Sequence, residues 1–208
     1  MYLPTHFQQN DPALLLEVMR LYNFVSLVCN VDGVPFASHV PVLAEEHQGQ
    51  IVIDGHLALP NPQWKAIEAG TAMLAIFHGP HTYVSPSLYQ PGNRVPTWDY
   101  IAVHATGTAQ TMHDTDSKLA VLGKLIQHHE PDFQTRFDDM PTAARDGLLK
   151  GIVAFRIKVE KLEGKFKLGQ HRIKDEIKDA KQSLYQTGDD NQQDIAAWMQ
   201  RLGYWDRD

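Results

Sequence analysis

The sequence is poor in cysteine, with the single thiol of Cys29 among its 208 residues. One cysteine excludes an intrachain disulfide and a zinc site built from several thiolates, and this usage is typical of a reducing cytoplasm. The chain also lacks a run of about 18 apolar residues, and its N-terminus lacks the basic and apolar regions of a signal peptide. We therefore expect a cytoplasmic protein without a membrane span.

Positive charge is scarce as well. The chain has 19 Lys and Arg residues against 25 Asp and Glu, which gives a net charge of −6. This balance argues against a surface that neutralises a nucleic-acid backbone, so direct nucleic-acid binding is not expected. Neither the GxGxxG nor the GxxxxGKS/T pattern occurs, and no serine elbow or matched pair of carboxylates marks a hydrolase. We assign no catalytic residue and no metal site.

The apolar residues that are present favour strands joined by short connections. Turn signals at Asp32-Gly33 and Gly79-Pro80 separate segments rich in β-branched and aromatic residues. This order predicts a mainly β fold with peripheral helices, an antiparallel barrel of six to seven strands. The predicted strands cover residues 24–30, 35–43, 51–54, 71–77, 81–85, 98–112 and 151–162.

Helices are indicated where a capping residue precedes a proline or an apolar periodicity of three and four. The predicted helices cover residues 12–22, 61–69, 114–130, 141–149, 173–184 and 194–202, with a polar break at 189–193. We expect one barrel domain over residues 1–185 and a helical tail over residues 186–208.

Three stretches carry the groups that a small ligand needs. Residues 77–108 are rich in aromatic rings and hydrogen-bonding groups, which suit a flat ligand with polar edges. Residues 55–61 form a strand, a turn and a helix start, where an anion could be received. Residues 164–172 form the dense basic cluster of an acidic chain, which suits a phosphate or carboxylate, although a solvated loop explains it equally well.

The motifs taken together resemble one family, the PaiB-like FMN-binding negative transcriptional regulators. They are YLPTHF at 2–7, GHLALPNPQW at 55–64, FHGPHTYVSPSLY at 77–89, VPTWDYIAVHATG at 95–107, HHE at 128–130 and EGKFKLGQHR at 163–172. The resemblance follows the chain in the same order to about residue 185. It implies an FMN-binding split β-barrel, related to pyridoxamine-phosphate oxidases, that works as a homodimer with FMN held between the subunits.

With FMN as the implied cofactor, each candidate residue has a chemical role. A phosphate needs cations and amides, the ring system needs apolar walls, and its polar edge needs hydrogen-bond donors. For the phosphate we select His56, the amides near Ala58, Asn61, and Lys167 or Arg172. Trp64 and Trp98 are candidates for the walls, Gln170 for the edge, Tyr83 and Ser85 for the slot, and His39 for either end.

The chain departs from the family pattern at several positions. Leu59 stands where relatives have an arginine, which removes a charge-assisted contact if that arginine touches phosphate. Asp99 replaces an asparagine, Gly169 and His171 replace a serine and an asparagine, and Leu88 replaces a tryptophan. These departures predict weaker FMN binding or a different ligand.

Two other functions stay open at this point. A flavin oxidoreductase needs only a placed flavin and an open face for its substrate, so the absence of catalytic side chains is compatible with one. A haem-binding or haem-degrading split barrel is the second alternative, with an axial histidine among His39, His81, His104 and His171.

Overall fold

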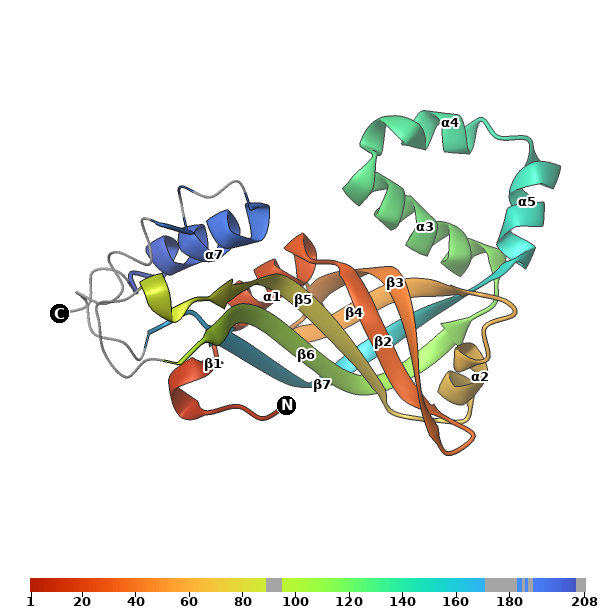
Figure 1. Cartoon of the computed structure of the whole chain (residues 1–208). Helices are drawn as coiled ribbons and strands as arrows, with labels where there is room; N and C mark the ends of the chain where they lie inside the picture. The colour runs from red at the N-terminus through yellow and green to blue at the C-terminus, as the bar shows by residue number, and fades with distance from the viewer. Residues whose placement is uncertain (89–94, 171–182, 185, 187–188, 205–208) are drawn as a thin grey trace. The chain divides into compact units, whose positions relative to one another are not determined.

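The computed structural model describes residues 1–88, 95–170, 183–184, 186 and 189–204 (Figure 1). Within this part of the chain, seven strands form one sheet in the order β1-β7-β4-β3-β2-β5-β6. A further pairing of β7 with β6 closes the strands from β7 to β6 into a ring, and β1 pairs with β7 beside it. The neighbour pairs whose registers are defined are all antiparallel. The strands are β1 (Gln8–Gln9), β2 (Phe24–Val31), β3 (Val34–His47), β4 (Gln50–Ala58), β5 (Met73–Val84), β6 (Thr97–Met112) and β7 (Ile152–Lys167).

The helices agree largely with the predicted ones. They are α1 (Pro12–Leu21), α2 (Gln63–Glu68), α3 (Thr115–His129), α4 (Gln134–Asp138), α5 (Thr142–Lys150) and α7 (Asp190–Arg201), with 3-10 turns at Thr5–Phe7, Pro86–Leu88 and Pro131–Phe133. Most of the helix predicted at 173–184 lies outside the described residues. Among the described residues, no helix is both long enough and apolar enough to cross a membrane.

Two sequence predictions of the fold are wrong. Gly79-Pro80 is not a turn, because β5 runs unbroken from Met73 to Val84. The polar break at 189–193 is also absent, because α7 begins at Asp190, and the Asp189 side chain accepts a hydrogen bond from the Gln192 amide. That contact satisfies one of the free amides at the helix start.

The chain divides into two compact units. The first contains residues 1–11, 78–103 and 163–208, and the second contains residues 12–77 and 104–162. In the second unit, β2 and β3 form the predicted hairpin, with positive φ angles of 52° at Asp32 and 83° at Gly33. Two consecutive left-handed residues match the twist of antiparallel strands.

The interior of the second unit depends on close backbone approaches. A Cβ on Gly107 of β6 would lie 1.9 Å from the carbonyl oxygen of Lys158 on β7. A Cβ on Gly55 of β4 would lie 2.6 Å from the ring of Phe155, its register partner on β7. Only glycine allows these approaches, so both positions are tied to strand packing.

Helix α3 covers one side of the sheet in the second unit. Its Val121 and Leu125 pack with Leu43 of β3 and Ala154 of β7 in a buried apolar cluster. Asp114 caps the helix, since its carboxylate accepts a hydrogen bond from the Ser117 amide at 2.8 Å. Helices α4 and α5 follow α3 along the chain and lie beside it in this unit (Figure 1).

Candidate functional site

His39 lies on the outer face of the second unit's sheet. The register pairs it with Ser26 of β2, and Ser26 in turn pairs with Ile76 of β5, so these three side chains share one face. The His39 imidazole is exposed and its Nδ1 lies 3.2 Å from Ser26 Oγ. One ring nitrogen is held by the sheet, and the exposed ring is open to a ligand.

His56 on β4 has a buried nitrogen without a partner. Its Nδ1 makes no hydrogen bond with any described residue. Burial lowers the pKa of the imidazole below its ordinary value. A neutral imidazole carries one donor and one acceptor, so this ring retains hydrogen-bonding capacity that the protein leaves unused.

The turn after β4 is held by Asn61. Its Nδ2 donates to Ser38 Oγ at 2.7 Å, and its Oδ1 accepts from the Gln63 amide at 2.9 Å. The Leu59 amide donates to the Gly151 carbonyl and the Asn61 amide donates to the Ala58 carbonyl. The amides on either side of this turn are therefore already bonded within the chain.

Trp64 makes contacts with its own unit on two sides. Its indole Nε1 donates to the Leu59 carbonyl at 2.8 Å, and its ring meets the His113 ring edge-on with centroids 5.8 Å apart. The His113 Nε2 lies 2.6 Å from the Glu68 carboxylate, which lowers the pKa of that carboxyl. These contacts fix the start and the end of α2, and they define a structural role for Trp64.

The first unit presents an exposed aromatic group. Trp98 is 54% exposed and Tyr83 is 48% exposed, with their ring centroids 6.0 Å apart in an edge-on contact. The His81 ring lies 6.3 Å from the Trp98 ring. Ser85 follows Tyr83, and its Oγ lies 2.8 Å from Ser87 Oγ. Such a group of exposed rings is typical of a ligand or protein contact.

Lys167 holds the start of β6 next to these rings. Its Nζ donates to Thr97 Oγ1 and to the Trp98 carbonyl, and it lies 3.8 Å from Asp99 Oδ1. Asp99 is buried and its Oδ1 accepts no hydrogen bond from the described residues. Burial raises the pKa of this carboxyl to about 6, against the opposing effect of the Lys167 charge.

Gln170 folds back on its own turn. Its Nε2 donates to the Phe166 carbonyl, and its Oε1 accepts from the Leu168 amide at 2.7 Å. Gly169 between them has a φ angle of 72°, a left-handed conformation that explains a glycine at this departure from the family pattern. Arg172 and His171 lie outside the described residues.

The predicted site residues thus fall into two sets, each within one unit. The second unit holds His39, His56, Ala58, Asn61 and Trp64, and the first unit holds Tyr83, Ser85, Trp98, Lys167 and Gln170.

The haem alternative requires an axial histidine. Of its four candidates, His39 and His81 are exposed, His104 is half-buried, and His171 lies outside the described residues. Within the described part of the chain, no three His, Cys, Asp or Glu side chains form a metal-binding group.

One charged network was missed by the sequence analysis. Asp54 on β4 is only 2% exposed and accepts two hydrogen bonds from Arg156 on β7, at 2.6 and 2.7 Å. Lys124 of α3 lies 3.2 Å from the same carboxylate and also contacts Glu45 of β3. The register places Asp54 opposite Arg156, a pairing over 102 residues that local periodicity does not indicate.

The strand order and the helices around the sheet define the fold class of the protein. A chiefly antiparallel sheet whose order closes through β6 and β7, with helices outside it, is the split β-barrel that the sequence predicted. Solved structures agree in fold: the flavocytochrome Anf3 from Azotobacter vinelandii matches with a TM-score of 0.59 and 14% identity, over 77% of this chain and 69% of that one. A FAD- and haem-binding protein from Mycobacterium smegmatis matches with a TM-score of 0.59 and 15% identity, over 77% and 73%.

The chain belongs to the family described as "Putative FMN-binding domain", whose model matches residues 1–161. It is also 31% identical, over 96% of its length, to the Protease synthase and sporulation protein PAI 2 of Bacillus subtilis (strain 168), of which 97% is covered. The PaiB-like resemblance is thereby confirmed. FMN, the cofactor expected from the sequence, is the cofactor by which this family is described.

Proposed function

We propose that this protein is an FMN-binding regulator of the PaiB type, acting as a homodimer with the flavin at the subunit interface. Membership of the FMN-binding family over residues 1–161 is the observation that carries the proposal. The name of the Bacillus subtilis relative, a sporulation protein, supports a regulatory role. Bound FMN would supply a ring system that can be reduced and reoxidised.

The residues of the second unit suit the phosphate and ribityl end. The unused Nδ1 of His56 needs a partner, because a buried polar atom without one costs free energy. The phosphate and hydroxyl groups of FMN offer such partners, and the exposed His39 ring stands on the outer face of the same sheet. Asn61 then acts chiefly by holding the turn through Ser38, together with Ala58 at the strand end.

The residues of the first unit suit the ring system. Trp98 and Tyr83 offer exposed aromatic faces, and Lys167 is fixed to the backbone of Trp98. Stacking on such rings is a favourable way to hold a flat heterocycle. We assign Ser85 to the rim of this slot and Gln170 to the shape of the turn beside it. Arg172 remains a candidate for the phosphate, whereas Trp64 of the second unit keeps the structural role that its own contacts define.

A homodimer is supported by an apolar outer face in the second unit. The register aligns Val28 of β2 with Ala37 of β3 and Leu74 of β5, all on one face, and none of the three is fully buried. Phe24 at the start of β2 is 64% exposed. These apolar side chains lie on the same outer face as Ser26 and His39, and exposed apolar groups of this kind are typical of an interface between subunits. In a dimer, the two sets of site residues can come from different subunits.

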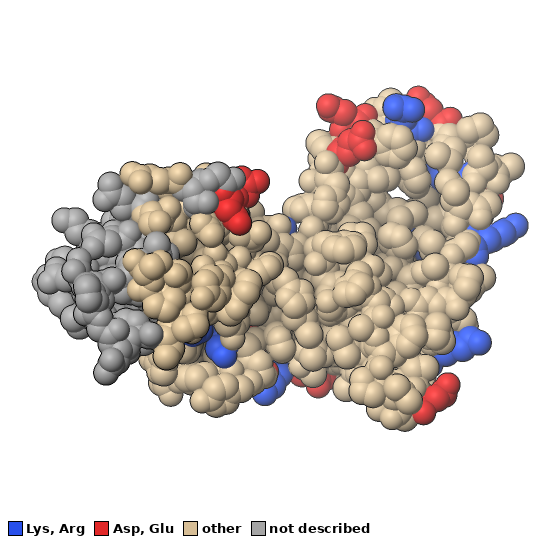
Figure 2. Space-filling view, viewed as in Figure 1, with Lys and Arg blue, Asp and Glu red and all other residues tan. Residues whose placement is uncertain are grey.

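The charge distribution argues that regulation does not proceed through a broad DNA-binding surface. The chain carries a net charge of −6. On the face shown in Figure 2, the Lys and Arg side chains of the described residues lie in separate small groups. Because nucleic-acid affinity depends on neutralised phosphates, we expect a gel-shift assay at low salt to show no sequence-selective binding.

The test is FMN binding by the purified protein. Titration with FMN should give an absorption band near about 450 nm and saturable quenching of flavin fluorescence. Trp98→Ala should weaken binding by about tenfold through lost stacking, since a good aromatic contact contributes about 1.4 kcal/mol. Tyr2→Ala, which removes a ring that is 84% exposed and outside the proposed slot, is the matched control.

The oligomeric state is tested separately by light scattering. We expect a mass of twice the 23.5 kDa of one chain, and Phe24→Asp should shift it towards the monomer. A protein that stays colourless and gives no quenching at saturating FMN would overturn the flavin assignment. A flavin that is bound and then turned over rapidly by NAD(P)H and an acceptor would instead favour the oxidoreductase.

A further inference from the structure

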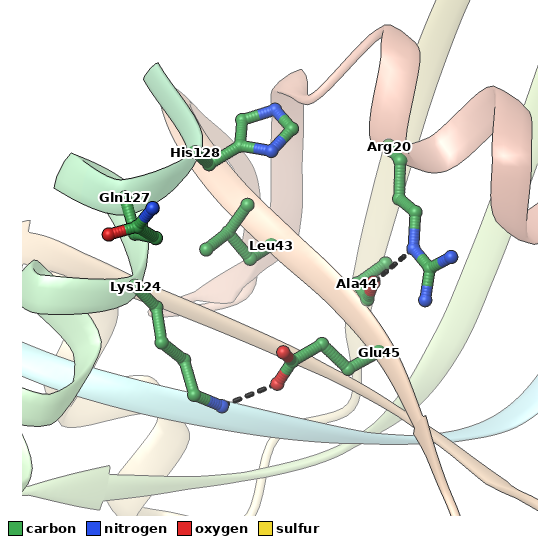
Figure 3. A pocket seen from close by; sticks show the side chains of 7 residues that line it. All are labelled: Arg20, Leu43, Ala44, Glu45, Lys124, Gln127 and His128. Carbon is green, nitrogen blue, oxygen red and sulfur yellow. Dashed lines mark hydrogen bonds and ion pairs between the residues drawn. The ribbon is translucent and has the colours of Figure 1, made fainter. Parts of the chain in front are cut away.

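A pocket of about 380 Å³ lies in the second unit, apart from every residue of the proposed flavin site. Its lining comes from α1, β3 and α3: Arg20, Leu43, Ala44, Glu45, Lys124, Gln127 and His128. Figure 3 shows Lys124, Gln127 and His128 from α3 on one side, Arg20 from α1 on the other, and Leu43 between them. Its volume falls in the range of pockets for small molecules.

Most of the charge around this pocket is internally balanced. Glu45 has a lowered pKa, mainly because its carboxylate accepts a hydrogen bond from Lys124, so it stays ionised. Burial alone would lower the pKa of Lys124, but its contacts with Glu45 and Asp54 outweigh burial and raise it. Asp54 is further paired with Arg156. Three cations and two carboxylates therefore stand together, counting Arg20.

Of these three cations, Arg20 is the one without a carboxylate partner among the described residues. Its Nε donates to the Ala44 carbonyl at 3.3 Å, a contact that orients the guanidinium at the pocket. Within the described chain, the structure gives its two terminal nitrogens no hydrogen bond or ion pair. Gln127 and His128, opposite, add polar groups that have no hydrogen bond to a described residue. A guanidinium with two free nitrogens has the geometry to bind a carboxylate with two parallel bonds.

We propose that this pocket binds a small organic acid with one carboxylate. Arg20 holds the carboxylate, His128 and Gln127 contribute hydrogen bonds, and the apolar part of the acid lies against Leu43. A monoanion is favoured over a phosphate dianion because one unbalanced cation is present and Glu45 repels a second negative charge. This site is independent of the flavin proposal.

The experiment uses benzoate as the probe and NMR titration of the full-length protein. Benzoate should bind saturably to the wild-type protein, and Arg20→Gln should weaken binding by about tenfold or more, because it removes the charge-assisted pair. Arg20→Lys should give an intermediate loss, since it keeps the charge and loses the fork. Arg136→Gln, which removes an exposed arginine of α4 in the same unit, should leave binding within about twofold.

Three results would overturn the assignment. They are no saturable benzoate binding up to about 10 mM, equal affinity in Arg20→Gln and wild type, or binding of inorganic phosphate in place of benzoate. Arg20 is exposed and makes one side-chain hydrogen bond, so the variant is expected to fold. Its circular dichroism spectrum checks this, and Arg20→Lys provides the same comparison if Arg20→Gln proves unstable.

Discussion

Lys167 Nζ lies 3.8 Å from Asp99 Oδ1, yet that oxygen accepts no hydrogen bond within the described chain, although Asp99 is only 1% exposed. The ammonium group donates instead to Thr97 Oγ1 and to the Trp98 carbonyl. Asp99 is thus a buried carboxyl whose Oδ1 faces a cation but accepts no hydrogen bond from a described residue, and burial raises its pKa to about 6. The family pattern that the sequence resembles implies an asparagine here, and an asparagine has no charge to bury.

Asp99→Asn should therefore stabilise the fold at neutral pH. The carboxyl has an ordinary pKa of 3.8 and a folded pKa of about 6, so the folded state binds its proton more tightly. Wild-type stability from this group is greatest at low pH and is lost as pH rises through the window between these values. The loss amounts to about 3 kcal/mol at most above pH 6.

Urea unfolding at several pH values measures this effect. We expect Asp99→Asn to gain about 1–3 kcal/mol over the wild type at pH 8 and to lose that advantage progressively as pH falls from about 6 to below 3.8. Asp132→Asn, at an exposed position, is the control and should change stability by less than about 0.5 kcal/mol. A stability difference independent of pH would show that Asp99 is not buried as a charge.

Gly107→Ala should prevent proper closure of β6 on β7. The added Cβ would lie 1.9 Å from the Lys158 carbonyl oxygen, and neither atom belongs to a flexible side-chain end. The strands must separate, at a cost of about 3 kcal/mol or more. Gly123→Ala in α3 meets nothing within 4 Å and should instead stabilise by about 0.5–1 kcal/mol, because alanine favours a helix. Thermal unfolding distinguishes the two outcomes.

Local signals predicted those elements whose causes are local. The Asp32-Gly33 turn and the helix predicted from residue 114 each depend on neighbours a few residues apart, and each was found as expected, with Asp114 as the cap of that helix. The Gly79-Pro80 pair misled, because its glycine serves a long-range contact. A Cβ on Gly79 would lie 2.9 Å from Cβ of Ile101, so glycine is required there for strand packing.

The candidate site also contains features that residue types predict and features that depend on the folded structure. Residue chemistry selected aromatic and basic groups as candidates, and the structure places Tyr83, Trp98 and Lys167 in one unit. Sequence could not foresee that the indole of Trp64 and the amide of Gln170 are bonded to their own backbone neighbours. Those bonds depend on turn geometry, which residue types alone do not determine.

Asp54→Asn should strongly destabilise the fold, although it only replaces one carboxylate oxygen with an amide NH₂. The neutral amide cannot accept from Arg156 and Lys124 as the carboxylate does, and it leaves one buried NH₂ facing cations. Breaking such a network from its buried member costs about 3 kcal/mol. Arg156→Lys keeps the charge and loses one of two hydrogen bonds, so it should cost less. Equal costs for the two variants, measured by urea unfolding, would contradict the bidentate pairing.

His56 should make the fold weaker in acid. Burial lowers its folded pKa below the ordinary 6.5, so the unfolded chain binds a proton that the folded chain resists. Stability from this residue is complete above pH 6.5 and falls as pH decreases below it. His56→Gln removes the titrating group, so the stability of this variant relative to wild type should improve steadily from pH 8 to pH 5. The value at pH 8, where both side chains are neutral, is the internal control for packing. If the stability difference between wild type and His56→Gln stays constant from pH 8 to pH 5, the His56 ring is hydrated in solution. Its Nδ1 would then have water as a partner and would give no support to a bound ligand.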